Sequence, residues 1–371
     1  MAMKILPRNL YVRKAISPFF FILLLAACLN IPATTTVTPF VLPSRTSLPT
    51  TSTLPIVIPT SGPAVTQELF SRYASLPSGQ YIVYGAEGGL YVISVDGQIH
   101  EKLTDLSGDS ISPDGTRIYD DAIYNLVTNQ VFSDPVPPNI CCLVRSGSPD
   151  GAMLALECWD DYEVYALSIQ DGNLVRLSYH LGLGEEEANF APMWSPDGKW
   201  IAYFKMRPAP PERKREIIVS ELYLADAGCI AEPETCVAKT RGPFRARFFK
   251  SFGPYGWSPD SRYLAIPGFD VGTILIVDIY KNEIKPLMVK GYGSVDATAW
   301  SLDGKWIAYS QFESEQNRTD QIFIVPAEGG EPIRLTSGAD DKVVMFWLRA
   351  YPNNPAARRA MRAQATCRKA M

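Results

Sequence analysis

Residues 194–203 read Trp-Ser-Pro-Asp-Gly-Lys-Trp-Ile-Ala-Tyr, and residues 300–309 read Trp-Ser-Leu-Asp-Gly-Lys-Trp-Ile-Ala-Tyr. A third copy, Trp-Ser-Pro-Asp-Ser-Arg-Tyr-Leu-Ala-Ile, occupies residues 257–266. Shorter copies begin at Ser112 and Ser148, and a degenerate copy begins at Leu76. The copies start at residues 76, 112, 148, 195, 258 and 301, at intervals of 36, 36, 47, 63 and 43 residues. Such self-similarity is typical of architectures in which one four-stranded sheet follows another.

The tetrad Ser-Pro-Asp-Gly is a turn signal. Pro presets φ at the second position, Asp suits the third, and Gly tolerates the left-handed conformation that often follows. In the clearest copies the tetrad separates an apolar segment that ends in Trp from an alternating segment such as residues 200–203. Each copy therefore predicts a hairpin, and six hairpins predict six blades. Six of the seven Trp lie in the motif or at its equivalent near residue 347, and we expect them to pack between blades rather than form a ligand cage.

These segments and the strands that follow them, such as residues 90–97 and 321–325, resemble the WD-like repeats of the TolB propeller and of peptidase-associated propellers. The resemblance covers residues 67–347 and implies an all-β fold, a six-bladed β-propeller. Residues 343–347 look like another strand before a turn, but residues 348–350 lack the tetrad. We expect this strand to close the ring against the first blade, which removes an exposed edge.

The first 28 residues predict an export signal and a lipid anchor. A basic segment precedes the apolar run Phe19–Ala27, which is too short for a spanning helix and is typical of a signal peptide. Residues 25–28, Leu-Ala-Ala-Cys, resemble the lipobox of bacterial lipoproteins, which implies cleavage after Ala27 and acylation of Cys28. The alternative is an ordinary secretory signal with a chance Cys.

The chain is therefore divided into a signal peptide (residues 1–27), the lipidated Cys28 with a Thr/Pro/Ser-rich linker (28–66), the propeller (67–347) and a basic tail (348–371). The linker composition predicts an extended stalk, the alternative being an edge strand on the domain. The tail is either a frayed end or a short basic helix that touches anionic lipid. Neither terminal segment, 1–27 or 348–371, contains an acidic residue, so the part between them is more acidic than the chain's net charge of -4. An acidic body argues against a nucleic-acid partner.

Six cysteines remain if Cys28 is acylated. Cys229 and Cys236 are close enough in sequence to form a disulfide in an exported protein. Cys142 and Cys367 are left unassigned, and free structural thiols are the alternative for them.

The hairpin at Ser148 suggests a second bridge. If its turn is centred between Pro149 and Asp150, Cys141 lies directly opposite Cys158. The sequence therefore predicts a disulfide between these two residues.

The sequence offers no catalytic residues, no cofactor site and no metal site. It contains two His, His100 and His180, no Gly-x-Ser-x-Gly elbow and no Cys-x-x-Cys pair. The acidic clusters are interpreted as solvated loop ends, and they comprise Asp120-Asp121, Asp160-Asp161, Glu185 to Glu187 and Asp340-Asp341. Of these, residues 160–161 and 185–187 are candidates for a calcium or cationic-ligand rim, without assignment as a site.

The resulting hypothesis is a non-catalytic, membrane-tethered binding or scaffold protein of the bacterial cell envelope. It would hold membrane lipid through acylated Cys28 and recognise an envelope protein or cell-wall ligand through propeller loops. The insertion from Pro208 to Phe252, where the repeat interval is longest, is the candidate recognition loop. The alternative function is that of a polysaccharide-active, lyase-like propeller or a peptidase-accessory propeller.

Overall fold

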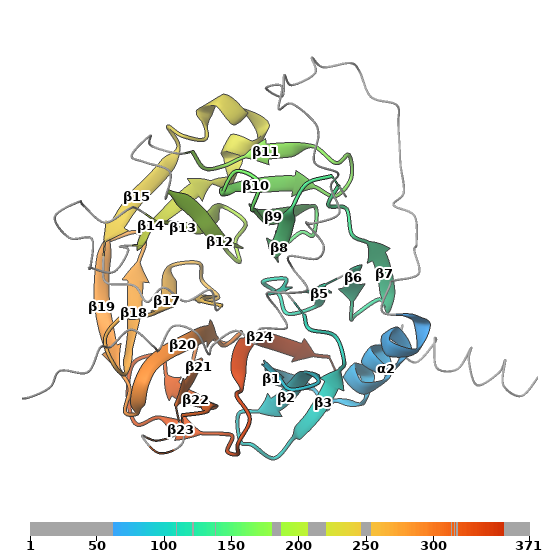
Figure 1. Ribbon diagram of the computed structural model, residues 1–371, viewed down its shortest axis with the longest axis vertical. Coiled ribbons are helices and arrows are strands. Elements are labelled where there is room, and N and C mark those ends of the chain that lie inside the picture. Colours follow the sequence, from blue (N-terminus) through green and yellow to red (C-terminus); the bar gives the residue numbers. More distant parts are fainter. Residues whose placement is uncertain are drawn as a thin grey trace, which may run out of the picture. The chain divides into compact units, whose positions relative to one another are not determined.

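The computed structural model describes residues 62–108, 110–120, 122–137, 139–179, 187–206, 220–245, 254–312, 314, 316 and 318–351. These residues form six four-stranded antiparallel sheets, arranged as the blades of a ring (Figure 1). The predicted six-bladed β-propeller is confirmed.

The first three blades contain short, mostly buried strands. Blade 1 comprises β24 (Val343–Ala350), β1 (Gly79–Ala86), β2 (Gly89–Ser94) and β3 (His100–Thr104). Blade 2 comprises β4 (Ser110–Ile111), β5 (Arg117–Tyr119), β6 (Ala122–Asn125) and β7 (Gln130–Ser133). Blade 3 comprises β8 (Cys142–Gly147), β9 (Met153–Cys158), β10 (Glu163–Ser168) and β11 (Leu174–Arg176).

The last three blades carry the longest repeats. Blade 4 comprises β12 (Ala188–Trp194), β13 (Trp200–Met206), β14 (Ser220–Asp226) and β15 (Thr240–Arg245). Blade 5 comprises β16 (Gly256–Trp257), β17 (Tyr263–Pro267), β18 (Thr273–Asp278) and β19 (Glu283–Met288). Blade 6 comprises β20 (Tyr292–Trp300), β21 (Trp306–Phe312), β22 (Asp320–Pro326) and β23 (Ile333–Arg334).

The repeated tetrad forms the predicted turn between the first two strands of blades 2 to 6. In blade 4, Ser195 Oγ donates to Asp197 Oδ1 at 2.7 Å, and the Trp200 N–H donates to Ser195 Oγ at 3.0 Å. Gly198 has a φ of 73°, which explains why Gly occupies this position. The same serine-to-aspartate bond recurs at Ser112, Ser148, Ser258 and Ser301.

The degenerate copy at Leu76 departs from this pattern. It follows a helix rather than a strand, so five tetrads form hairpins where the sequence predicted six. The inner strand of blade 1 comes instead from β24, which pairs with β1 along its length and places Trp347 opposite Ile82. The ring is thus closed by the predicted strand, and the exposed edge of β1 is removed.

The tryptophans before the turns pack against the preceding blade, as predicted. The indole N–H of Trp257 in blade 5 donates to the Met193 carbonyl of blade 4 at 3.2 Å. Trp194 lies in a buried cluster with Ala155 of blade 3. These rings therefore fix adjacent blades to each other.

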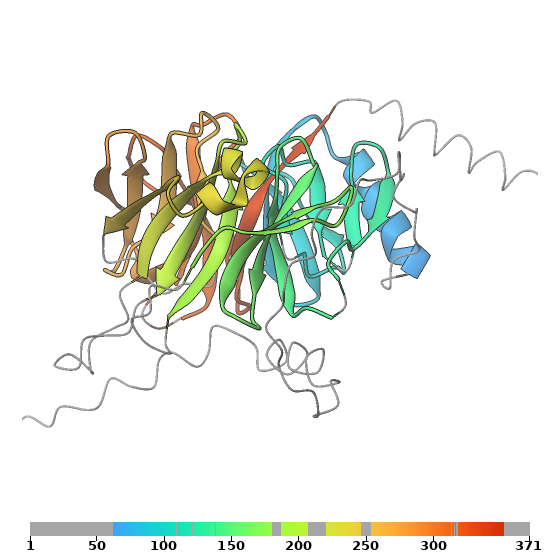
Figure 2. The ribbon, with the colours of Figure 1, turned by 90° about the horizontal axis from the view of Figure 1, so that it is seen from above.

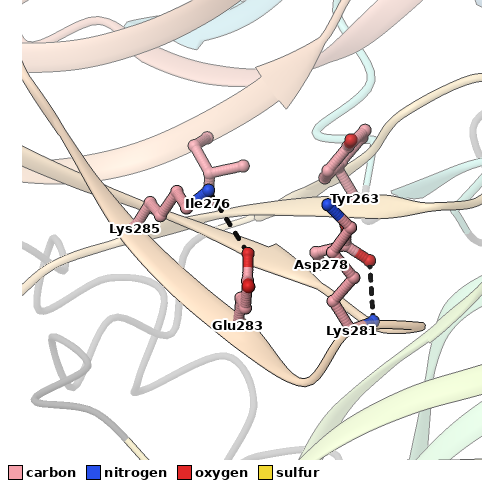
Figure 3. A pocket seen from close by; sticks show the side chains of 6 residues that line it. All are labelled: Tyr263, Ile276, Asp278, Lys281, Glu283 and Lys285. Atoms are coloured by element: carbon pink, nitrogen blue, oxygen red, sulfur yellow. Dashed lines mark hydrogen bonds and ion pairs between the residues drawn. The ribbon is translucent and has the colours of Figure 1, made fainter.

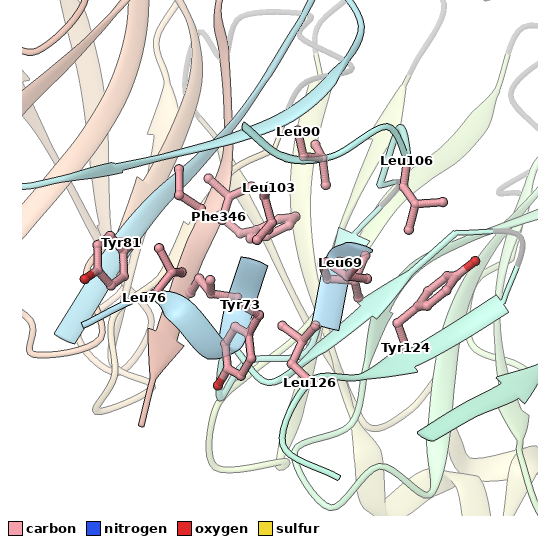
Figure 4. Close-up of a cluster of buried hydrophobic side chains, with 14 of the residues drawn as sticks. Leu69, Tyr73, Leu76, Tyr81, Leu90, Leu103, Leu106, Tyr124, Leu126 and Phe346 are labelled. Carbon is pink, nitrogen blue, oxygen red and sulfur yellow. The ribbon is translucent and has the colours of Figure 1, made fainter. Parts of the chain in front are cut away.

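Helix α2 (Gly62–Ser75) was not predicted, because its first residues lie in the Pro- and Ser-rich stretch assigned to the linker. Leu69, Tyr73 and Leu76 recur at helical spacing and are almost fully buried. They pack in one cluster with Leu103 of blade 1 and Leu126 of blade 2 (Figure 4). The folded domain therefore begins at the helix, before residue 67.

Candidate binding face

The two ends of the ring carry different connections between strands (Figure 2). We call the end that carries the repeated turns at Ser112, Ser148, Ser195, Ser258 and Ser301 the turn face. Because the strands of each blade are antiparallel, the opposite end carries the turns between second and third strands and the connections between blades. We call this end the loop face; residues 159–162 and 335–342 belong to it.

The acidic clusters seen in the sequence lie on the loop face. Asp120 follows β5, residues 160–161 join β9 to β10, Glu187 precedes β12, and residues 340–341 precede β24. The topology thus gathers acidic residues from four distant stretches of the chain at one end of the ring, of which Glu187 is buried. Asp121, Glu185 and Glu186 lie outside the described residues.

Two exposed aromatic side chains stand on the same face, in the four-residue loop between β9 and β10. Trp159 is 37% exposed and Tyr162 is 54% exposed. The other six tryptophans are buried or half-buried, so Trp159 is the exception among the seven. Sequence reasoning missed both residues, although Trp159 was the one tryptophan outside the repeated motif.

This loop, Trp159–Tyr162, is held at both ends. The Trp159 N–H donates to the Cys141 carbonyl at 2.8 Å, and the Cys141 N–H returns a bond of 2.8 Å to Asp160 Oδ2. Asp161 Oδ2 accepts from the Tyr165 hydroxyl at 2.5 Å. The Tyr162 carbonyl accepts from the N–H of Asn189 in the next blade at 2.8 Å. The exposed rings are therefore mounted on an ordered support.

A disulfide joins β8 to β9 at the residue just before this loop, but it is not the predicted one. Cys158 is bonded to Cys142, with which it pairs in the ladder, and not to Cys141. The Ser148 N–H donates to the Met153 carbonyl at 2.8 Å, and the Met153 N–H donates to Ser148 Oγ at 2.9 Å. A bulge between Val144 and Ser146 shifts the register further along. The assumed hairpin centre was therefore wrong, which moved the pairing by one residue.

The remaining cysteines named in the sequence analysis are Cys229, Cys236, Cys28 and Cys367. Cys229 and Cys236 are disulfide-bonded in the structure, across the short 3₁₀ segments η2 (Ala227–Ala231) and η3 (Pro233–Thr235). Cys28 and Cys367 lie outside the described residues, so acylation of Cys28 remains a prediction.

The candidate recognition loop from Pro208 to Phe252 is not a single loop. Its middle part forms strands β14 and β15 of blade 4, and the disulfide-closed segment between them lies on the turn face. Residues 207–219 and 246–253, which include the basic run at 213–215, lie outside the described residues. The long repeat interval therefore reflects several separate connections within one blade.

Two ion pairs within blade 3 have buried carboxylates that also accept hydrogen bonds from blade 4. Arg145 Nε lies 2.9 Å from Glu157 Oε2, and that carboxylate also accepts from the Ala191 N–H at 2.8 Å. Glu163 pairs with Arg176 and accepts from Asn189 Nδ2 at 2.9 Å. Each buried charge therefore has a partner, as burial requires.

A buried pair of carboxyl groups, Asp296 and Asp320, lies where blade 6 meets the closing strand β24. Burial and the adjacent carboxyl of Asp296 raise the pKa of Asp320 to about 9, and burial also raises the pKa of Asp296. Two carboxyls this close share a proton rather than both ionise. The Asp320 N–H donates to Asp341 Oδ1 at 3.0 Å, and the Asp320 carbonyl accepts from the Lys342 N–H at 2.8 Å. The described part of the chain contains no group of three His, Cys, Asp or Glu arranged to hold a metal ion.

A shallow pocket lies on blade 5, lined by side chains of β17, β18 and β19 and the turn between the last two (Figure 3). Its volume is about 70 Å³, well below the several hundred Å³ of sites for organic ligands. Glu283 pairs with Lys285 at 3.2 Å, and Asp278 Oδ1 accepts from the Lys281 N–H at 3.1 Å. We therefore place no ligand in this pocket.

The chain resembles known proteins over part of its length. It is 29% identical over 159 residues to the uncharacterized protein Atu1656 of Agrobacterium fabrum, covering 38% of this chain and 53% of that one. The chain thus spans about half the length of the curated relative it matches. No protein-family model matches the sequence.

Among solved structures, TolB from Acinetobacter baumannii aligns with a TM-score of 0.48 at 16% identity, over 72% of this chain and 66% of that one. A putative TolB from Agrobacterium tumefaciens aligns with a TM-score of 0.36 at 24% identity, over 52% of this chain and 61% of that one.

Within the described ranges, the helices are too short or too polar to span a bilayer.

Proposed function

We propose that the protein is a non-catalytic binding or scaffold protein of the bacterial cell envelope, tethered to a membrane through acylated Cys28. Its loop face would hold a protein or cell-wall ligand. The observation that supports this proposal best is the convergence on one face of acidic residues from three stretches of chain, at positions 120, 160–161 and 340–341, with the exposed rings of Trp159 and Tyr162. Exposed aromatic residues on an ordered support are typical of binding hot spots.

The sequence supports the tether. A lipobox-like segment ends at Cys28, and the Thr/Pro/Ser-rich residues that follow suit a stalk between a membrane and the folded domain. Two or more acyl chains on Cys28 would give stable anchoring, whereas a single chain would not.

Site-specific crosslinking in cells tests the binding role. A photoreactive phenylalanine analogue at position 162 probes the loop face, and the same analogue at Tyr280, which is 53% exposed on the turn face, is the matched control. We expect one defined adduct at 162 and none at 280. Equal labelling at both positions, or no adduct at 162, would contradict the proposal.

Membrane fractionation tests the tether separately. We expect the wild type in the membrane fraction and Cys28→Ala in the soluble fraction. Membrane association of Cys28→Ala equal to that of the wild type would exclude acylation of Cys28 as the anchor.

A further inference from the structure

We infer that Val271, Met288 and Tyr292 form an apolar patch on the loop face, and that this patch binds a short segment of a protein partner through large apolar side chains of that segment. We call these three residues the apolar patch. The inference rests on the proposed binding function, and it names the place and the chemistry of one contact.

The three side chains are exposed and lie where blade 5 meets blade 6. Val271 is 61% exposed in the connection between β17 and β18. Met288, which is 62% exposed, and Tyr292, which is 50% exposed, flank the connection from blade 5 to blade 6. Both connections belong to the loop face. Nine large apolar side chains are exposed in the described part of the chain, and three of them lie here.

Backbone hydrogen bonds hold the two connections together. The Val289 N–H donates to the Gly272 carbonyl at 2.8 Å, and the Gly272 N–H donates to the Gly293 carbonyl at 3.1 Å. Each of these three residues directly adjoins one residue of the apolar patch in the chain. The Thr273 hydroxyl also contacts Met288 Sδ at 3.7 Å, across the ladder in which these two residues pair. The members of the patch are therefore neighbours in space.

Two glycines allow this close approach. Gly272 has a φ of 61°, and a Cβ there would lie 2.4 Å from the Val289 carbonyl oxygen. A Cβ at Gly291 would lie 1.9 Å from Oε1 of Gln311, a fully buried side chain of blade 6. The connection thus rests tightly on blade 6. A patch on an ordered backbone loses little conformational freedom when a partner binds.

The fold does not require apolar side chains at these positions. Met288 is the last residue of an outer strand, and the other five outer strands end in polar residues, which are Thr104, Ser133, Arg176, Arg245 and Arg334. Tyr292 is the first residue of an inner strand and is the one aromatic residue at this position among the six blades. Apolar side chains that gather in water without a structural need are typical of interaction sites.

The size of the patch indicates which kind of partner it fits. Three side chains cannot bury the roughly 800 Å² per partner that is typical of a stable dimer, which argues against a second copy of this chain. A patch of this size fits the anchor of a hot spot, where one or two apolar side chains of a partner are covered. Met adapts its shape to such side chains easily.

The charge beside the patch is already balanced. Lys290 is the one charged residue between Met288 and Tyr292, and its ammonium lies 2.7 Å from Glu331 Oε1. A partner therefore meets an apolar contact rather than an unpaired charge. A lipid phosphate would have to compete with Glu331 for this cation, which favours a protein segment over a membrane surface.

Fluorescence anisotropy with two labelled ten-residue peptides tests the inference. Both peptides consist of Gly and Ser, and one carries leucine at two positions where the matched peptide carries alanine. The full chain carries Cys28→Ala in this assay, so that no detergent competes for the patch. We expect the leucine peptide to bind at least about fivefold more tightly than the alanine peptide. Its affinity should not fall as salt rises, because no charge pair forms.

Variants locate the binding. Val271→Ser combined with Met288→Ser should weaken binding of the leucine peptide at least about fivefold. Met288→Leu, which keeps an apolar side chain, should bind like the parent protein. The matched control is Val237→Ser combined with Tyr280→Ser, which removes side chains that are 57% and 53% exposed on the turn face. This control should leave the affinity unchanged.

Three results would overturn the inference: equal affinity for both peptides, no binding of the leucine peptide, or equal losses in the two double variants. Sedimentation of the same protein with phosphatidylcholine vesicles, lost in the patch variant, would assign the patch to lipid and would also overturn it. The crosslinking adduct at position 162 reports on the proposed binding function separately. Its presence together with any of these results would leave that function standing and exclude the patch as the contact.

Discussion

Trp347 on the closing strand donates its indole N–H to the carbonyl of Ala299 on β20 at 2.9 Å, and its ring is 3% exposed. This contact joins β24, whose ladder partner is the first strand, to the last blade. Trp347→Ala should therefore lower the free energy of unfolding by about 3–5 kcal/mol, as expected for a buried Trp. Urea denaturation measures this loss. Trp159→Ala removes the same side chain from the surface and should cost about 0.5 kcal/mol or less. Similar losses in the two variants would contradict the role of Trp347 in closure.

A second prediction concerns two glycines at equivalent turn positions. Gly115 and Gly304 have φ values of 70° and 75°, so Ala at either position costs about 1 kcal/mol for the left-handed conformation. A Cβ at Gly115 would also lie 2.7 Å from the Trp347 carbonyl oxygen, whereas at Gly304 it would make ordinary contacts with Pro259. Gly115→Ala should thus lose a further 1–3 kcal/mol or so to overpacking. Equal melting temperatures for the two variants would exclude the close approach.

The buried carboxyl pair predicts a pH dependence of stability. The pKa of Asp320 is about 9 in the folded state and about 3.9 in an unfolded chain. Between these pH values the folded state keeps a proton that the unfolded state has released, so the free energy of unfolding falls as pH rises. Asp320→Asn should remove up to about 1.4 kcal/mol per pH unit of this slope, and should be more stable than wild type near pH 8.

Denaturation curves between pH 5 and pH 9 measure that slope. Asp96→Asn is the control. The hydroxyl of Ser94 lowers the pKa of Asp96, so this carboxylate is ionised in both states above pH 5. The control should leave the slope in this range unchanged. A wild-type slope that survives in Asp320→Asn would show that another group holds the proton.

The register of blade 3 predicts which cysteine bonds to Cys158. In Cys141→Ser the Cys142–Cys158 disulfide should remain, because the ladder places these two residues opposite each other. In Cys142→Ser that pairing is lost, and stability should fall by about 3 kcal/mol. Mass spectrometry of non-reduced peptides identifies the bond, and its loss in Cys141→Ser would contradict the observed register.

The conformation of Tyr162 predicts an effect on stability. Tyr162→Asn should raise the free energy of unfolding by about 0.5–1 kcal/mol, since Asn adopts the left-handed region more easily. Thermal melting measures this gain. A less stable Tyr162→Asn protein would show that the ring supports the fold.

Much of the fold could be predicted from the sequence because its information is local. The serine-to-aspartate bond within each tetrad depends on residues two positions apart, so the turn is recognisable without the rest of the chain. Closure by residues 343–347 was also predictable, since they resemble a strand that precedes a turn but are followed by none.

The missed features depend on contacts distant in sequence. Helix α2 has a short apolar face that is meaningful only against blades 1 and 2. The bulge after Val144 has no residue signature, yet without it the register of Ser146 and Gly147 would place Leu143, and not Cys142, opposite Cys158. The acidic loops lie at one end of the molecule because the order of strands in every blade places these connections there, which the sequence alone does not show. The exposure of Trp159 could have been suspected from the sequence, because Trp159 is the one tryptophan outside the repeated motif.

Ring closure by β24 also has a consequence for how truncations behave. During translation β1 is synthesised early, whereas its partner β24 is synthesised after all the other described strands. The edge of β1 therefore stays unpaired until residues 343–350 have been made. A nonsense codon just upstream of residue 343 would leave blades 2 to 6 complete. In blade 1 the backbone N–H and C=O groups of β1 would be unpaired along one edge, where a strand of another molecule could pair with them. Loss of β24 should therefore be as damaging as loss of a whole blade, through aggregation of a protein whose other blades are complete.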